Sequence, residues 1–210
     1  MNKINYQQKL DELIASLDGK RPSLLLHSCC APCSSYCLEY LARYFDITVL
    51  YYNPNISPEA EFRKRANEEA RFIDEFPAAA GVKLIVDEYH PEEFYSAVHG
   101  LENAPEGGER CFICYRLRLE RTARYASEHG FDLFCTTLSI SPMKNCEKLN
   151  EIGEELSAVY GVKYLPSDFK KRGGYKRSIE LSHEYGLYRQ NWCGCIFSQR
   201  DAKTPHRSDV

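Results

Sequence analysis

The sequence predicts an α/β fold in which a parallel, doubly wound β-sheet is flanked by helices. Short apolar runs of the kind found in buried parallel strands alternate with amphipathic helical patterns along most of the chain. The chain has 210 residues, 43% of them hydrophobic, which is enough to bury one sizeable core. Because no Gly/Ser-rich or Pro-rich stretch offers a linker, we expect a single domain over residues 1–210.

The first elements predict a β-α-β unit. Apolar positions in Gln7–Leu17 recur at helical spacing, and Ser23–His27 is a short continuous apolar run typical of a buried strand. A helix is expected over Tyr36–Phe45, after Pro32, which suits a first helical turn. Ile47–Tyr52 then predicts a second strand, closed by an Asn-Pro pair.

The same alternation continues through the rest of the chain. Ser57-Pro58-Glu59 opens a charged amphipathic helix that extends to about Phe76. Further strands are expected at Val82–Val86, Asp132–Thr136 and Val162–Leu165. Further helices are expected after Pro91 and over Cys111–His129, Lys144–Tyr160 and Tyr175–Tyr185. We expect the polar tail Thr204–Val210 to be disordered.

Charge and hydropathy narrow the class of protein. The formal net charge is −3, so the chain is no polycation that would grip any nucleic acid unselectively, although a local basic patch is compatible with it. The start has no signal-peptide pattern, and no apolar run approaches the roughly 20 residues that span a bilayer. We therefore expect a cytoplasmic protein with no membrane partner.

Ten cysteines are notable in a protein expected in a reducing compartment, where such thiols are more often metal ligands or redox groups than disulfides. Cys29, Cys30 and Cys33 lie where the first strand ends and a helix begins, which is where ligands gather in open parallel sheets. The unpaired N–H groups and partial positive charge of a helix start stabilise thiolates. This motif is therefore the first candidate site.

Cys111 and Cys114 are two residues apart, so at a helix start they share one face and can reach one metal or cluster. Together with Cys29 and Cys30 they supply four thiolates, the number that a [4Fe-4S] cluster or a tetrahedral zinc ion needs. Adjacent cysteines fit a cluster more easily than zinc, whose usual ligand pair is spaced by two to four residues. Spacing alone leaves cluster, structural zinc and thiol redox chemistry open.

A third pair is Cys193-Gly-Cys195, whose glycine permits a tight turn that brings both sulfurs together. This pair could ligate a second metal or form a strained, reducible disulfide. The remaining cysteines are interpreted as structural or incidental and stay outside the site: Cys37, Cys135 and Cys146.

Further strings accompany the cysteine motifs in a fixed order: Tyr52-Asn-Pro-Asn-Ile56, Gly108-Glu-Arg-Cys-Phe-Ile-Cys114, Thr136-Thr-Leu138, Ser141-Pro142, Asp168-Phe-Lys-Lys171 and Tyr188-Arg-Gln-Asn-Trp-Cys-Gly-Cys195. With them the chain resembles the QueH family of epoxyqueuosine reductases from about residue 23 to residue 198. The resemblance implies a Rossmann-like domain related to the adenine nucleotide α-hydrolases. It also implies the final step of tRNA queuosine biosynthesis, in which the epoxide of epoxyqueuosine at the wobble position becomes the alkene of queuosine.

The resemblance further implies a [4Fe-4S] cluster held by Cys29, Cys30, Cys111 and Cys114, a neighbouring mononuclear iron, and no cobalamin. The ligands of that iron stay open between Cys33 and the pair Cys193 and Cys195. The two electrons come from an external donor whose identity the sequence does not give. Because His27-Ser-Cys-Cys-Ala-Pro-Cys33 replaces the glycine- and serine-rich phosphate loop of nucleotide-using relatives, we expect no use of ATP.

The predicted catalytic residues are Cys193, Cys195, Asp168 and His27. His27, Asp168 or Tyr115 would donate a proton to the leaving oxygen, since each lies in or beside a matched motif. For His27, a hydrogen-bonded core position is the more common situation of a histidine at the end of an apolar strand.

For tRNA, the segment 170–177 offers five positive charges: Lys170, Lys171, Arg172, Lys176 and Arg177. The run Arg63–Arg65 is a second basic patch, although such runs are more often solvated helix faces. Tyr175 and Trp192 are candidates to stack on a splayed base.

Two other functions compete with a reductase. A zinc-only chain would be a noncatalytic tRNA-binding or scaffold protein. An iron-sulfur tRNA thiolase would share fold type and cluster but would activate its base with ATP, which requires the missing phosphate loop.

Overall fold

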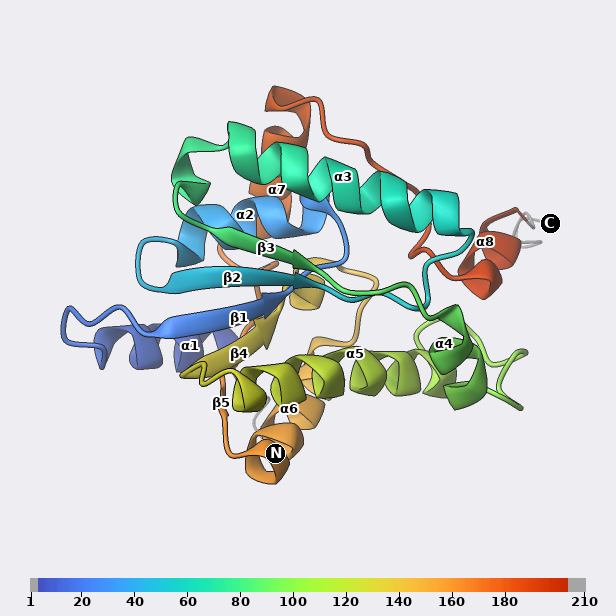
Figure 1. Cartoon of the computed structure of the whole chain (residues 1–210), viewed down its shortest axis with the longest axis horizontal. Coiled ribbons are helices and arrows are strands. Elements are labelled where there is room, and N and C mark those ends of the chain that lie inside the picture. The colour runs from blue at the N-terminus through green and yellow to red at the C-terminus, as the bar shows by residue number, and fades with distance from the viewer. Residues whose placement is uncertain (1–3, 204–210) are drawn as a thin grey trace.

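A five-stranded parallel sheet forms the centre of the computed structural model, which describes residues 4–203 (Figure 1). The strand order is β3-β2-β1-β4-β5, and all neighbouring strands are parallel. The strands are β1 (Ser23–His27), β2 (Asp46–Tyr51), β3 (Lys83–Val86), β4 (Leu133–Thr136) and β5 (Lys163–Tyr164). The α-helices are α1 (Tyr6–Ala15), α2 (Ala31–Leu41), α3 (Glu59–Glu75), α4 (Pro91–Ala97), α5 (Glu109–Glu128), α6 (Cys146–Tyr160), α7 (Gly174–Glu184) and α8 (Ile196–Lys203).

The central position of β1 in the sheet explains why its residues Leu24–Leu26 are all apolar. Leu24 and Leu26 pack into the core on the side of α2, while Leu25 belongs to the core on the side of α5 and α6. Both faces of the sheet are therefore covered, so that alternation with polar residues is lost. Figure 1 shows the layers, with α2, α3 and α7 on one face and α5 and α6 on the other.

The point where the sheet reverses its winding lies between β1 and β4. From β1 the chain first crosses to β2 and β3 on one side, and later returns to β4 and β5 on the other. In open parallel sheets the crevice at such a point, outside the carboxyl ends of the strands, is where ligands bind. β1 ends at His27, so the first cysteine motif follows directly at this crevice.

The predicted α/β fold is confirmed, and the predicted strands and helices are all present. Helix α2 begins at Ala31 rather than Tyr36, because Pro32 occupies its first turn and Cys30 is its N-cap. Helix α8 was not predicted. The tail predicted to be disordered, 204–210, lies outside the described residues. Within the described chain, no helix combines the length and apolar character that a bilayer crossing requires.

Candidate metal centre

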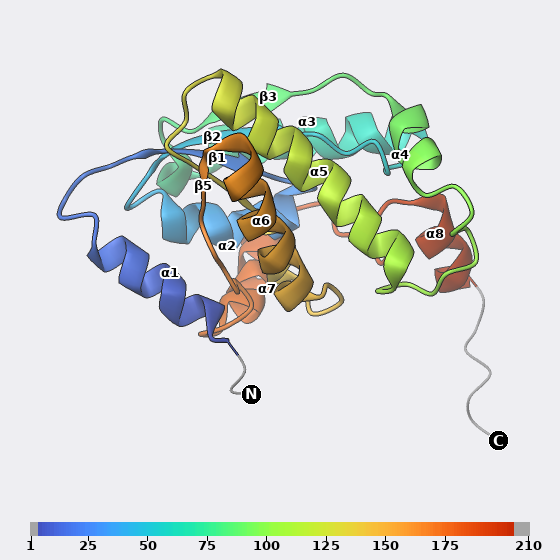
Figure 2. The same ribbon diagram turned by 90° about the horizontal axis from the view of Figure 1, so that it is seen from below.

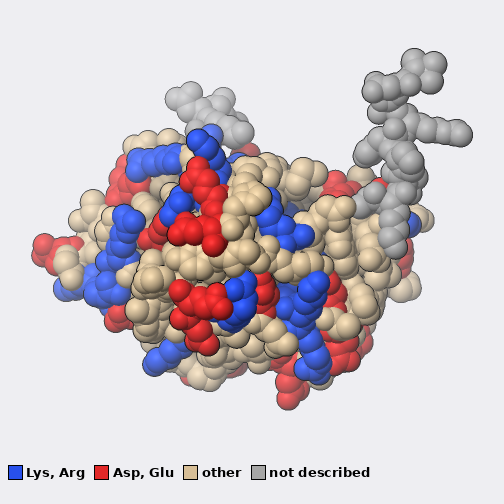
Figure 3. Space-filling view, turned by 90° about the horizontal axis from the view of Figure 1, so that it is seen from above, with Lys and Arg blue, Asp and Glu red and all other residues tan. Residues whose placement is uncertain are grey.

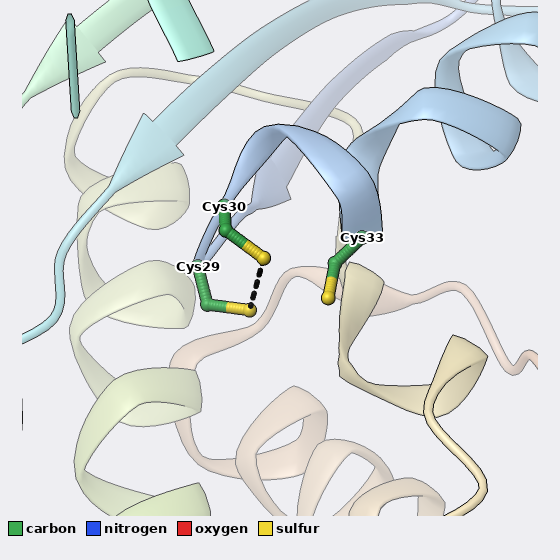
Figure 4. Close-up of side chains that lie close together, drawn as sticks. All are labelled: Cys29, Cys30 and Cys33. Carbon is green, nitrogen blue, oxygen red and sulfur yellow. Dashed lines mark hydrogen bonds between the residues drawn. The ribbon is translucent and has the colours of Figure 1, made fainter. Parts of the chain in front are cut away.

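The first cysteine motif gathers three thiols at the end of β1. The sulfur atoms of Cys29, Cys30 and Cys33 all lie within 4.8 Å of one another, and those of Cys29 and Cys30 are 3.8 Å apart (Figure 4). Cys30 has extended backbone, and its carbonyl oxygen accepts hydrogen bonds from the amides of Cys33 and Ser34 as α2 begins. The turn therefore places the sulfurs of residues 29, 30 and 33 on one side.

The three thiols shift one another's pKa values. Hydrogen bonds from the thiols of Cys30 and Cys33 hold the pKa of Cys29 well below its usual range. The hydrogen bond with Cys29 raises the pKa values of Cys30 and Cys33. No side chain caps the start of α2, so its N-terminal amides and dipole remain available to the thiolate. The motif is thus prepared to bind a soft cation through sulfur.

The second pair lies in the first turn of α5. Cys111 and Cys114 are both buried, and the sulfur of Cys111 accepts a hydrogen bond of 3.2 Å from the amide of Gly107. Cys111 packs in the same apolar cluster as Cys29 and Cys30. Cys114 belongs to a neighbouring cluster with Cys195. Helix α5 therefore connects the first cysteine motif with the third.

In the third pair, the sulfurs of Cys193 and Cys195 are 3.5 Å apart. Gly194 between them has a φ of +114°, and a Cβ at this position would lie 2.8 Å from Cγ1 of Ile56. The carbonyl oxygen of Gly194 accepts a hydrogen bond of 2.9 Å from the amide of Ser57. The interaction between the two thiols lowers the pKa of Cys193 and raises that of Cys195. The predicted tight turn is confirmed, and all ten cysteines are free thiols.

A cavity of about 1130 Å³ brings the first and third motifs together. Its wall includes Cys29, Cys30, Cys33 and Cys193, together with Trp192, and Tyr175 lies on it as well. Four positively charged side chains also line it: Arg65, Arg118, Lys144 and Arg189. Two carboxylates, those of Glu106 and Asp201, line it as well, so the cavity combines sulfur ligands, aromatic rings and charges of both signs.

The predicted proton donors do not line this cavity. His27 is fully buried, with Nδ1 2.9 Å from the Thr136 hydroxyl and Nε2 3.1 Å from the Tyr52 carbonyl oxygen, and burial lowers its pKa to about 4. These contacts match the core interpretation of His27. Tyr115 is buried, which raises its pKa to about 12. Asp168 lines a second cavity and pairs with Lys170 at 2.6 Å.

The second cavity, of about 820 Å³, adjoins the first. Both are lined by Pro142, Met143 and Lys144, so this short segment forms a ridge between them. Its other walls come from the start of α1, the start of α6 and the segment 168–172. Cys146, which the sequence left outside the site, lies on this second cavity, while Cys37 and Cys135 are buried in the core as predicted.

The predicted basic segment 170–177 carries less free charge than its sequence suggests. Arg172 pairs with Asp11, Arg177 with Glu39 at 2.6 Å, and Lys176 with Glu180 at 3.9 Å. Among the described residues, Lys171 is the member of this segment for which no ion pair is found. The segment is thus a set of ion pairs with one free lysine.

The run Arg63–Arg65 divides between surface and interior. Arg63 pairs with Glu59 on the exposed face of α3, as expected for a solvated helix face. Arg65 points inward, is 1% exposed and pairs with Glu61 at 2.7 Å. Figure 3, which views the molecule from the side of α3, shows Lys and Arg beside Asp and Glu across this face. No basic patch is formed by this run.

Sequence reasoning missed the cations of the first cavity, Arg118, Lys144 and Arg189. Arg118 lies four residues after Cys114, so helical spacing alone places it on the same face of α5 as the cysteine. Lys144 and Arg189 lie in or beside motifs that the sequence singled out, Ser141-Pro142 and Tyr188–Cys195. Only the fold shows that these separate motifs share one cavity.

A doubly wound parallel sheet with free thiols gathered at its switch point defines the class: a Rossmann-like protein with a cysteine-rich candidate metal site. The model of the family described as Epoxyqueuosine reductase QueH matches residues 24–201. This chain belongs to the QueH family.

Several relatives carry the name Epoxyqueuosine reductase QueH. The protein from Staphylococcus epidermidis is 47% identical over 202 residues, covering 93% of this chain and 85% of the relative. The protein from Streptococcus pyogenes serotype M1 is 46% identical, covering 94% of this chain and 79% of the relative. The protein from Thermotoga maritima is 37% identical, covering 88% of this chain and 94% of the relative.

Among solved structures, the fold resembles that of the U34-tRNA thiolase NcsA from Methanococcus maripaludis with its [4Fe-4S] cluster. The TM-score is 0.57 at 14% identity, covering 92% of this chain and 67% of that chain. At this identity the likeness concerns the fold.

Proposed function

We propose that this protein is an oxidoreductase that converts epoxyqueuosine at the wobble position of tRNA to queuosine, in the cytoplasm. The observation that carries the proposal is the convergence of the Cys29, Cys30 and Cys33 thiols on a large cavity. It occurs in a chain of the QueH family, whose named relatives are epoxyqueuosine reductases. No comparable argument favours a thiolase, because the likeness to that enzyme is limited to the fold.

The residues present fit an iron-sulfur group. The buried sulfur donors of the first motif, with Cys111 in the same cluster, match the soft thiolate set that such clusters use. Cys29, Cys30, Cys111 and Cys114 would hold a [4Fe-4S] cluster, and Cys33 or the pair Cys193 and Cys195 would hold an additional mononuclear iron. When bound, these groups supply electrons one at a time. We propose that neither cobalamin nor ATP takes part.

The reaction balances with two electrons and two protons. Both carbon–oxygen bonds of the epoxide break, a carbon–carbon double bond forms between the former epoxide carbons, and the oxygen leaves as water. The electrons come from an external donor. The ammonium group of Lys144, which is largely buried on the cavity wall, would donate a hydrogen bond to the departing oxygen.

Substrate binding is assigned to the two cavities and the ridge between them. A modified base in an anticodon loop can be splayed out at modest cost, and Trp192 and Tyr175 offer rings to stack on it in the first cavity. The second cavity, with Lys171 and Lys170 on its wall, would receive a flanking nucleotide. The ridge at Met143, 67% of which is exposed, would separate the two nucleotides.

The deciding experiment is an assay on protein purified without oxygen. Iron, sulfide and zinc are determined per chain, and the protein is incubated with epoxyqueuosine-containing tRNA and a strong reductant. Nucleosides are then read by mass spectrometry. We expect iron with sulfide and loss of one oxygen atom from the base, both abolished by Cys111→Ala and both retained by Cys135→Ser, whose side chain lies in the core away from both cavities.

Zinc without sulfide, together with an intact epoxide, would overturn the assignment and make the site structural. ATP consumption with sulfur incorporated into the base would identify a thiolase instead.

A further inference from the structure

Arg118 is a buried arginine without a carboxylate partner. It lies on α5, is 3% exposed, and donates from Nε to the carbonyl oxygen of Cys114 at 3.1 Å. Within residues 4–201 no carboxylate lies within 4.0 Å of its guanidinium nitrogens. By contrast, Arg116 and Arg121 on the same helix pair with Glu155 and Asp87. Of these three arginines, Arg118 is the one that is buried and has no carboxylate partner.

A buried guanidinium needs a countercharge because it does not release its proton in proteins and its desolvation is costly. Arg118 lines the same cavity as Cys29, Cys30, Cys33 and Cys193, and its Nε contacts the backbone of Cys114. These cysteines come from the three separate motifs. A negatively charged group held by their sulfur atoms would therefore take the role that carboxylates have for the neighbouring arginines.

Arg65, the other buried arginine on the cavity wall, does not share this situation. It pairs with Glu61 at 2.7 Å and also donates to the carbonyl oxygen of Cys193 at 3.3 Å. Its charge is therefore balanced by an acid whether or not the thiols are ionised. Lys144 likewise has Glu106 at 3.8 Å.

We propose that Arg118 is a positioning residue whose fixed charge balances the thiolate-bound metal group and sets its reduction potential. The identity of that group rests on the proposed function. A reduced iron-sulfur cluster carries one more negative charge than the oxidised cluster. A positive charge nearby in a low-dielectric site therefore stabilises the reduced state and raises the potential. Removing that charge lowers the potential and leaves the cluster harder to reduce.

The test compares reduction potentials of the anaerobically loaded protein, measured by redox titration followed by electron paramagnetic resonance. Arg118→Met replaces the charged group with an unbranched apolar side chain, and Arg118→Lys keeps the charge. Arg116→Gln, on the exposed face of the same helix, is the matched control. We expect a lower midpoint potential in Arg118→Met, a potential near wild type in Arg118→Lys, and no shift in Arg116→Gln.

An unshifted potential in a fully loaded Arg118→Met protein overturns the inference. If Arg118→Met fails to load, iron and sulfide content decides: recovery in Arg118→Lys supports a charge requirement, and equal loss in both variants overturns it. A wild-type protein that holds only zinc also overturns it. A shifted potential in a protein that leaves epoxyqueuosine intact upholds the role of Arg118 and contradicts the proposed function alone.

Discussion

At the scale of the residue, Gly194 shows how closely the third cysteine motif is packed. Its φ of +114° is costly for any residue with a side chain, and a Cβ there would meet Ile56. Gly130 also has a positive φ, of +70°, but its Cβ would meet nothing within 4 Å. A side chain at Gly130 would cause backbone strain alone, whereas one at Gly194 would cause both backbone strain and a steric clash.

This difference predicts the outcome of two substitutions. Gly130→Ala should lower the free energy of unfolding by about 1 kcal/mol through strain alone. Gly194→Ala should cost about 2–3 kcal/mol, because the turn that pairs Cys193 with Cys195 must shift, and under the proposed function it should also lower the iron content. Urea denaturation and iron analysis measure both effects. Equal costs with full iron content would contradict the role given to the turn.

Glu69 gives the fold a dependence on pH. This carboxyl group on α3 is fully buried, and burial raises its pKa to about 7, while the hydroxyl groups of Ser34 and Ser28 lower it only in part. The folded state therefore binds this proton more tightly than the unfolded state, whose carboxyl titrates at the ordinary value of 4.5. The contribution of Glu69 to the free energy of unfolding is fully present below about pH 4.5 and is lost as the pH rises to about 7.

Glu69→Gln should remove that loss. Relative to wild type, we expect the variant to gain up to about 3 kcal/mol in the free energy of unfolding between pH 4.5 and pH 7. Chemical denaturation across this range is the measurement. Glu75→Gln, at the exposed end of the same helix, serves as the control. A difference between wild type and Glu69→Gln that stays constant with pH would show that Glu69 is ionised in the fold.

At the scale of the element, α8 connects the third cysteine motif to the rest of the fold. Phe197 packs with Phe94 of α4 and with Cys114 and Cys195. Figure 2 shows α8 beside α4 and the start of α5. The amide of Ser198 donates to the sulfur of Cys195 at 3.3 Å. The helix thus holds the Cys193–Cys195 turn in place.

Truncation of Phe197 should detach this helix. Phe197→Ala is expected to lower the free energy of unfolding by about 3 kcal/mol and to increase proteolysis near residue 196. Ile196→Ala, whose side chain is 39% exposed, should cost much less. Chemical denaturation measures the free energy of unfolding of both variants, and limited proteolysis measures their cleavage near residue 196. Equal behaviour of the two variants would mean that α8 does not depend on its apolar contact.

Prediction from sequence succeeded where an element carries its own pattern. The run Leu24–Leu26 and the amphipathic spacing of α3 and α5 are local, so strands and helices followed from them. Helix α8 has only eight residues, and Phe197 is stabilised by partners about a hundred residues away. The start of α2 at Ala31, by contrast, has a local signal, because Pro32 occupies the first turn of the helix.

At the scale of the whole molecule, the charge balance sets expectations for tRNA binding. The net charge is −3, and most cations of the segment 170–177 are paired. Binding should then depend on few phosphate contacts. Lys171→Glu is expected to weaken tRNA binding several-fold and to reduce the slope of log Kd against log salt by about 1. Lys83→Glu, at the amino end of β3, should change neither quantity.

Fluorescence anisotropy at several salt concentrations checks this prediction. An unchanged slope in Lys171→Glu would place the nucleic acid away from the second cavity.

The candidate site shows the same limit of sequence prediction as helix α8. The cysteine motifs were found from their spacing, but the sharing of a cavity by Cys33, Arg118 and Cys193 depends on how the connections between the parallel strands fold.

The separation of the three cysteine motifs along the chain also affects how the site is made. About 160 residues lie between Cys33 and Cys193, and a ribosome takes roughly 10–30 s to add them. During that interval the first three thiols emerge without their partners, open to oxidation or to capture of another soft metal. If the proposed function holds and Cys193 is a ligand, the metal site can be completed only after Cys193 has been translated, so timing as well as affinity would govern its assembly.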